Sequence, residues 1–133
     1  MLRLGLDLVS VAEVRRSLDE HGERYLSRVF TEEEVAECGG AENPSAERLA
    51  GRFAAKEAAI KVLASQSDAT PWREIEVLAG ARGEPRLHLS GNCAELARRA
   101  ELETFAVSIT HEGEYAAAAV IAYQDLRTSP VGR

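Results

Sequence analysis

Residues 2–9 alternate between hydrophobic leucines and other residues, a pattern that predicts a β-strand. One face of this strand carries Leu2, Leu4, Leu6 and Leu8. Asp7 lies on the opposite face, because successive side chains of a strand point to opposite sides. Ser10 and Glu13 have the spacing of a capping box, which predicts a helix that begins there and ends near His21. Asp7 therefore precedes a junction between strand and helix, where functional side chains often occur.

Hydrophobic periodicity predicts two further helices, then a β-hairpin, another helix and a second hairpin. These elements occupy, in order, the segments 31–38, 45–64, 75–89, 91–100 and 105–123, with a loop at 66–71. Strands joined by hairpins favour an α+β fold, with a mainly antiparallel sheet packed against the long helix. The predicted domain spans residues 1–124, and the tail 125–133, which has no pattern, is expected to be disordered.

Composition limits the kind of protein that this chain can be. It has 133 residues, and no apolar run approaches the roughly 20 residues of a membrane span. The net charge of −6 argues against non-specific binding of nucleic acid. Cys38 and Cys93 lack the spacing of metal ligands and are expected to be reduced thiols. The N-terminus leads directly into the first strand without a signal peptide, so a cytoplasmic location is expected.

The long helix carries one carboxylate where a helix should be apolar. At about 100° per residue, Glu57 falls at the edge of the hydrophobic stripe that contains Phe53 and Ile60. A carboxylate in this position is costly unless a cation or several hydrogen-bond donors meet it. Lys56 and Lys61 flank it, and a metal ion would serve as well. The pattern fits an active site, although a structural ion pair would produce the same pattern.

Three sequence blocks, Gly5–Val9, Gly51–Lys61 and Ser108–Glu112, carry a resemblance to a known family. The segment Trp72–Val77 and the turn Gly83–Pro85 accompany them. With these blocks, nearly the whole chain resembles the small, single-domain holo-acyl-carrier-protein synthases of the 4′-phosphopantetheinyl transferase superfamily. The block Gly51–Lys61 is close to diagnostic of that family.

The resemblance implies an enzyme that transfers 4′-phosphopantetheine from coenzyme A to a serine of an apo acyl carrier protein. Adenosine 3′,5′-bisphosphate is the other product, and Mg²⁺ is the expected cofactor. The family likeness also implies a homotrimer that binds coenzyme A in clefts between neighbouring subunits. Carrier proteins of fatty-acid, polyketide and peptide synthesis are all possible partners.

The same resemblance assigns roles to individual residues. Asp7 and Glu57 correspond to the metal-binding, catalytic carboxylates, which suits Mg²⁺ because this ion prefers a few carboxylates, waters and substrate phosphates. Lys61 corresponds to the catalytic lysine near the pyrophosphate, and its place four residues after Glu57 lets it reach the same phosphates. The carrier serine is expected to lose its proton to a metal-bound water or to one of the carboxylates. Coenzyme A is expected to contact Arg52, Lys61, Gly83, Pro85 and His111.

One position departs from the family pattern. Glu84 occupies the middle of the Gly-x-Pro turn, where the family often has a lysine or an arginine. A phosphate contact from this side chain is therefore not expected. Arg82 and Arg86 are the alternative sources of such a contact.

The helix that follows Asp7 is expected to rim the site and to meet the acidic carrier protein. Its pattern exposes Arg15 and Arg16, which can pair with the carboxylates of a docking helix. Ordinary solvated arginines are the alternative interpretation.

Two other functional classes stay open. A binding module that keeps this fold without catalysis would not need Asp7, Glu57 and Lys61 together. A different Mg²⁺-dependent phosphoryl-transfer enzyme, such as a nuclease, is disfavoured by the acidic net charge and the lack of a basic groove.

Overall fold

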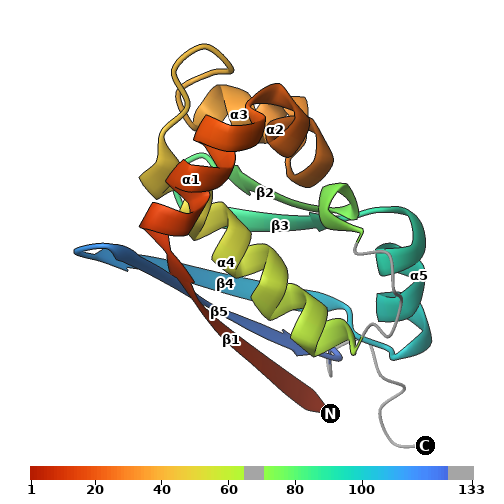
Figure 1. Ribbon diagram of the computed structural model, residues 1–133. Coiled ribbons are helices and arrows are strands. Elements are labelled where there is room, and N and C mark those ends of the chain that lie inside the picture. The colour runs from red at the N-terminus through yellow and green to blue at the C-terminus, as the bar shows by residue number, and fades with distance from the viewer. Residues whose placement is uncertain (65–70, 126–133) are drawn as a thin grey trace, which may run out of the picture.

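A computed structural model describes residues 1–64 and 71–125 of the chain (Figure 1). Its elements are, in order, β1 (Leu2–Ser10), α1 (Val11–His21), α2 (Glu23–Val29), α3 (Glu32–Glu37), α4 (Ala46–Leu63), the 3₁₀ turn η1 (Trp72–Glu74), β2 (Ile75–Ala79), β3 (Pro85–Leu89), α5 (Gly91–Arg99), β4 (Thr104–Glu112) and β5 (Tyr115–Tyr123). Every predicted helix and strand is present. Of the loop expected at 66–71 and the tail expected at 125–133, residues 66–70 and 126–133 lie outside the described residues. No helix in the described part of the chain is long and apolar enough to cross a membrane.

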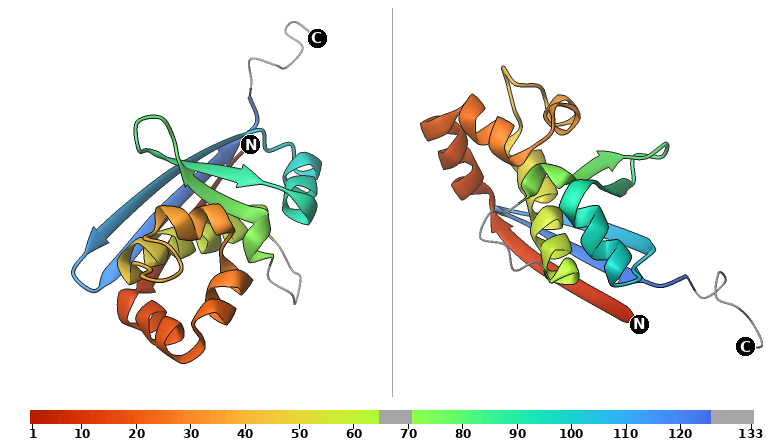
Figure 2. Two further views of the ribbon diagram at one scale, coloured as in Figure 1. Left: turned by 90° about the horizontal axis from the view of Figure 1, so that it is seen from above. Right: turned by 90° about the vertical axis from the view of Figure 1, so that its right-hand side faces the viewer.

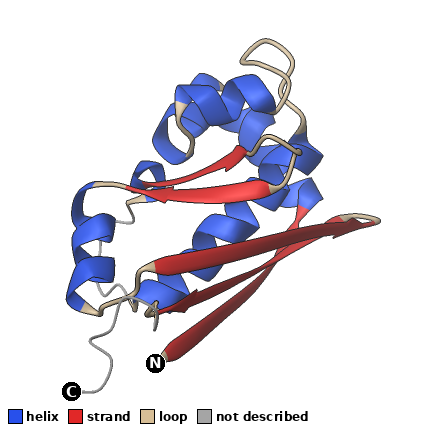
Figure 3. Ribbon diagram, turned by 180° about the vertical axis from the view of Figure 1, so that it is seen from behind, coloured by secondary structure: helices blue, strands red, loops and turns tan. Residues whose placement is uncertain are grey.

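α4 is the central element of the fold. The strands β1, β5 and β4 form an antiparallel sheet in that order, and α4 lies across one of its faces (Figure 1). β2 and β3 form a second antiparallel sheet, which Figure 3 shows as a separate pair of strands. The helices α1, α2 and α3 gather at the N-terminal end of α4 (Figure 2). The predicted α+β class and antiparallel pairing are therefore confirmed, with the strands divided between two sheets.

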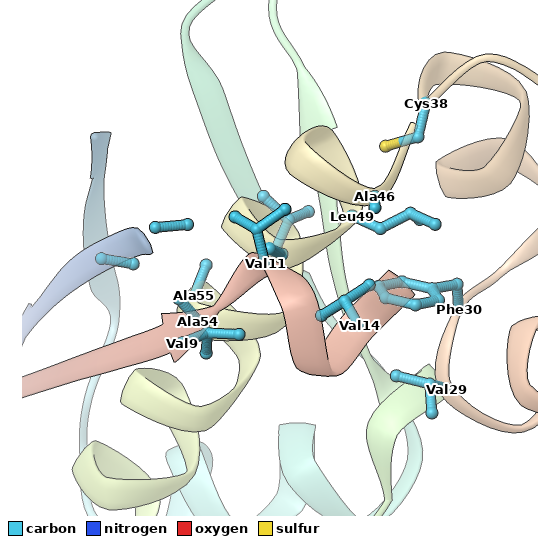
Figure 4. Packing of buried hydrophobic residues seen from close by; sticks show 14 of the residues in the cluster. Val9, Val11, Val14, Val29, Phe30, Cys38, Ala46, Leu49, Ala54 and Ala55 are labelled. Carbon is cyan, nitrogen blue, oxygen red and sulfur yellow. The ribbon is translucent and has the colours of Figure 1, made fainter. Parts of the chain in front are cut away.

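Small side chains on α4 let the sheet come close to the helix backbone. Five alanines of α4 are completely buried: Ala50, Ala54, Ala55, Ala58 and Ala59. Larger side chains fill the N-terminal end of the core, where Val11, Val14 and Phe30 pack near Leu49 (Figure 4). The hydrophobic effect there rests on aliphatic side chains and on the buried ring of Phe30, against which the partly buried Tyr25 packs.

β1 packs against α4 with its less hydrophobic face. Its four leucines, Leu2, Leu4, Leu6 and Leu8, are 63–66% exposed. The reason is steric, because a Cβ atom at Gly5 would lie only 2.0 Å from the carbonyl oxygen of Ala58. Since residues two apart share a face, this close approach places Gly5, Asp7 and Val9 on the helix side. The hydrophobic face predicted for this strand exists, but it lies on the open side of the sheet.

The sequence pattern did not reveal α2. This helix has seven residues, and no side chain caps its N-terminus. It is separated from α1 by Gly22, whose φ of 52° breaks the helix at the position where the pattern ended. Leu26 and Val29 bury its inner side, so tertiary packing stabilises a helix too short to be stable alone.

Candidate active site

Asp7, Glu57 and Lys61 meet where β1 crosses α4. The Nζ atom of Lys61 lies 3.3 Å from Oδ1 of Asp7 and donates a 2.7 Å hydrogen bond to the carbonyl oxygen of Leu6. Glu57 lies one helical turn before Lys61 and interacts with the Asp7 carboxylate. The structure therefore brings together the three residues that the sequence assigned to catalysis.

Asp7 has an unsatisfied oxygen. Its side chain is 12% exposed, and Oδ2 is buried with no hydrogen-bond partner among the described residues. A buried polar atom without a partner is costly, and strain, a catalytic role, or a bound water or ion can account for such an atom. A cation or a donor from a bound molecule would satisfy it.

Glu57 holds its proton more tightly than an ordinary glutamate. Burial and, secondarily, the neighbouring Asp7 carboxylate together raise the pKa of Glu57 to about 7, while Lys61 acts in the opposite direction. Two carboxylates in one site disfavour each other's ionised form. A single lysine therefore leaves the pair short of positive charge.

The pair Asp7 and Glu57 fits a Mg²⁺ ion. This ion commonly takes one or two carboxylates and fills its remaining positions with waters and substrate phosphates. The described residues contain no group of three or more histidine, cysteine, aspartate or glutamate side chains that could hold a metal. The two carboxylates and the unsatisfied Oδ2 of Asp7 thus suit an ion that also binds substrate oxygens.

Tyr25 is a neighbour of the site that sequence reasoning missed. Burial raises the pKa of Tyr25 to about 12, and the negative charge of Glu57 contributes. Its ring packs edge-on against Phe30, with centroids 5.8 Å apart. Because Tyr25 belongs to α2, which carries no clear sequence signal, no motif pointed to it.

Lys56 does not face the site, although it flanks Glu57 in the sequence. Its side chain is completely buried, and Nζ lies 2.7 Å from Oε1 of Glu34. It also donates to the carbonyl oxygens of Trp72 (2.8 Å) and Ile75 (2.6 Å). Burial lowers the pKa of Lys56, and Glu34 opposes this shift. Of the two flanking lysines, only Lys61 meets the Asp7 carboxylate.

Arg52 is engaged in structural contacts. Its Nε donates a 2.7 Å hydrogen bond to the carbonyl oxygen of Val77, and its Nη2 lies 2.6 Å from Oε1 of Glu37. The side chain is 15% exposed. A direct contact between Arg52 and coenzyme A stays a prediction.

His111 and the Gly-x-Pro turn lie on different elements around α4. His111 is exposed near the end of β4, and its Nε2 lies 3.1 Å from the carbonyl oxygen of Glu47. Gly51 makes room for this ring, since a Cβ there would lie 2.9 Å from the same nitrogen. Gly83 has a φ of 81°, so the turn needs glycine, and Pro85 opens β3. Coenzyme A contacts at His111, Gly83 and Pro85 stay predictions.

Glu84 stabilises the turn that contains it. Its Oε1 accepts a 2.8 Å hydrogen bond from the backbone N–H of Arg82, and its Oε2 lies 3.7 Å from Nε of Arg86. The backbone hydrogen bond is the main reason that the pKa of Glu84 is lowered. An acid at this position thus organises the hairpin turn.

α1 exposes both arginines that the sequence assigned to docking. Arg15 and Arg16 are exposed, and Nη1 of Arg15 lies 3.8 Å from Oε2 of Glu114. Such an exposed, long ion pair holds Arg15 only weakly, so this side chain is available to another acidic surface.

Comparisons with known proteins show the family to which this chain belongs. A family profile described as the 4′-phosphopantetheinyl transferase superfamily matches residues 3–120. Holo-[acyl-carrier-protein] synthase from Gloeobacter violaceus is 40% identical over 118 residues, which cover 89% of each protein. The protein of the same name from Chloroflexus aggregans is 39% identical and covers 95% of this chain and 98% of its own length.

Solved structures show the same fold. The complex of ACPS with CoA from Chronobacterium ammoniagenes superposes with a TM-score of 0.80 at 29% identity, covering 94% of this chain and 98% of that one. The acyl carrier protein synthase of Mycobacterium tuberculosis gives a TM-score of 0.69 at 34% identity, covering 92% and 96%.

The raised pKa of Glu57 predicts how the free energy of unfolding depends on pH. Because its pKa is about 7 in the folded protein, against an ordinary value of 4.5, the wild-type protein loses stability as pH rises through this interval. Glu57→Gln cannot ionise, so it should gain stability relative to wild type between pH 5 and pH 8. Urea unfolding of both proteins across this range measures the difference, and parallel curves would contradict the raised pKa.

Proposed function

The chain belongs to the 4′-phosphopantetheinyl transferase superfamily, and on this premise we propose that it is a holo-[acyl-carrier-protein] synthase. It transfers 4′-phosphopantetheine from coenzyme A to a serine of an apo acyl carrier protein and releases adenosine 3′,5′-bisphosphate. The observation that carries the proposal is the meeting of Asp7, Glu57 and Lys61 at one crossing of strand and helix. A binding module freed from catalysis would have no need for this costly arrangement.

The residues of the site suit a displacement at phosphorus. The serine oxygen forms a bond to the phosphorus next to the pantetheine, and the bond from that phosphorus to the bisphosphate oxygen breaks. Lys61 places a positive charge where the leaving oxygens gain negative charge. The serine proton passes to water or to one of the two carboxylates. Asp7 and Glu57 would hold a cation, which would orient the diphosphate for this displacement.

Mg²⁺ is the cation proposed for this site. Asp7 and Glu57 would hold it, as the unsatisfied Oδ2 of Asp7 and the raised pKa of Glu57 suggest. When bound, it supplies Lewis-acid polarisation of the diphosphate oxygens.

The acidic carrier protein is proposed to dock on α1. This helix begins directly after β1, which carries Asp7, so a partner on α1 has its serine near the carboxylates. Arg15 and Arg16 present positive charge on an otherwise acidic protein. Complementary charge favours this orientation of the partner and speeds its association.

A homotrimer is proposed because the open face of the three-stranded sheet is apolar. The four exposed leucines of β1 face away from α4, and in the antiparallel register Leu2 pairs with Tyr123 and Leu4 pairs with Ile121. A contiguous hydrophobic patch on a small protein usually marks a protein interface. Contact between copies through this sheet would also bring neighbouring subunits together around the coenzyme A cleft.

The activity is tested by intact mass. An apo acyl carrier protein should gain one phosphopantetheine after incubation with this protein, coenzyme A and Mg²⁺, and no gain should occur with EDTA. No gain with several carriers would favour the binding module.

Glu57→Gln should fold normally and lose about 10³-fold or more in turnover, because a charged ligand of the proposed cation is missing. Near-normal turnover by this variant would refute the ligand role of Glu57.

The docking surface is tested by charge reversal. Arg15→Glu combined with Arg16→Glu should raise the KM for the carrier protein about tenfold or more, since two attractions become repulsions. The KM for coenzyme A should stay unchanged. Arg98→Glu combined with Arg99→Glu, two exposed residues of α5, is the matched control for reversal of surface charge. If the carrier KM does not move, the carrier docks elsewhere.

The oligomer is tested on the exposed leucines. Leu4→Asp combined with Leu6→Asp should yield a monomer in sedimentation velocity, whereas wild type should sediment as a trimer. Both side chains are exposed in the single subunit, so the fold should persist by circular dichroism. A trimer that survives these charges would place the subunit contacts on another face.

A further inference from the structure

The outer edge of β2 is capped by charged side chains instead of another strand. One edge of β2 pairs with β3. On the other, the backbone N–H groups of Val77 and Ala79 donate to the carboxylates of Glu34 and Glu37, each at 2.9 Å. These two glutamates lie three residues apart on α3, so they share one side of that helix.

Two cations of α4 complete this edge. Lys56 donates to the carbonyl oxygen of Ile75, and Arg52 donates to that of Val77. The cations are four residues apart, so they project from the same side of α4. Each also pairs with one glutamate of α3: Lys56 with Glu34 and Arg52 with Glu37. α3, α4 and β2 are thus joined by two parallel bridges.

The bridge between Lys56 and Glu34 is completely buried, and each donor of the ammonium group has an acceptor. Lys56 and Glu34 are both 0% exposed. The ammonium group has three donors and meets three acceptors, namely Glu34 and the carbonyl oxygens of Trp72 and Ile75. Glu34 also accepts from the backbone N–H of Thr31. A buried pair with every group satisfied allows one geometry only, because any shift leaves a buried charge unpaired.

This geometry fixes the rotation of α4 about its axis. Glu57 follows Lys56 directly, so its side chain projects about 100° further around the helix. On another side of α4, Gly5 of β1 lies against the carbonyl oxygen of Ala58 and cannot move closer. The bridge and this contact together decide where Glu57 stands relative to Asp7.

We propose that Glu34 and Lys56 are a positioning pair, which holds α4 in the rotation that lets Glu57 share a divalent cation with Asp7. The pair touches neither the cation nor the substrate. The inference rests on the proposed function for the identity of the site, and it adds residues that act through Glu57.

The test is cation affinity, measured directly. Lys56→Met keeps the length of the side chain and removes its charge. Mn²⁺ binding to the protein in the presence of coenzyme A, followed by electron paramagnetic resonance, should weaken about tenfold, the loss typical of residues that orient a metal ligand. The experiment is done well below the unfolding temperature, with folding checked by circular dichroism.

A matched control separates positioning from stability. Leu49→Ala removes a completely buried side chain of the same helix that has no polar contact with α3 or β2. It should lower the unfolding temperature and leave Mn²⁺ affinity within twofold of wild type. Equal weakening by Leu49→Ala and Lys56→Met, or none by Lys56→Met, would overturn the proposal.

A second variant covers the case in which Lys56→Met does not fold. Glu34→Gln keeps the buried volume and loses the charge, and the folded variant should also bind Mn²⁺ about tenfold more weakly. Wild-type affinity in folded Glu34→Gln, or failure of both variants to fold, would assign the pair to stability alone. Failure of the proposed function gives a different result, because wild type would then modify no carrier protein whatever its Mn²⁺ affinity.

Discussion

The close approach of β1 to α4 at Gly5 is the constraint on which the rest of the structure depends. The Ala58 carbonyl oxygen occupies the space of a Cβ atom at this position, so no other residue fits without moving the backbone. Asp7 lies two residues further along and on the same face of the strand. Glu57 is the neighbour of Ala58 in the helix. The contact between Gly5 and Ala58, which packs β1 against α4, therefore also places the carboxylate of Asp7 close to that of Glu57.

This arrangement opposes stability locally and is maintained by contacts elsewhere. The unsatisfied Oδ2 of Asp7 and the raised pKa of Glu57 are both unfavourable features of the free protein. The alanine core packs β1 against α4, and the buried bridge from Lys56 to Glu34 holds α4 in place despite them. Sites that bind cations commonly combine such local cost with a rigid surround. The fold thus holds two carboxylates beside one lysine, so that a bound cation would stabilise the site.

Sequence patterns predicted the site better than they predicted its surroundings. Asp7, Glu57 and Lys61 could be found because they stand in the sequence blocks that resemble the family. Strand alternation and helical spacing then indicate where each side chain points. The orientation of β1 could not be found in this way, since the leucines look like a core face and only the contact at Gly5 reverses it. α2, which contains Tyr25, was not predicted from the sequence because tertiary packing, and not a local pattern, stabilises this helix.

The two lysines of α4 show why spacing alone does not assign a role. Lys56 and Lys61 both flank Glu57 in sequence, and each is close to a carboxylate. The ammonium group of Lys56 uses all three donors on buried acceptors, so none is left for a phosphate. Lys61 uses two of its donors, on Leu6 and Asp7, and its side chain is 55% exposed. Among the described residues, the contacts of Lys61 leave one donor for a substrate oxygen. The acceptors around each lysine, which the fold supplies, make one structural and leave the other available for chemistry.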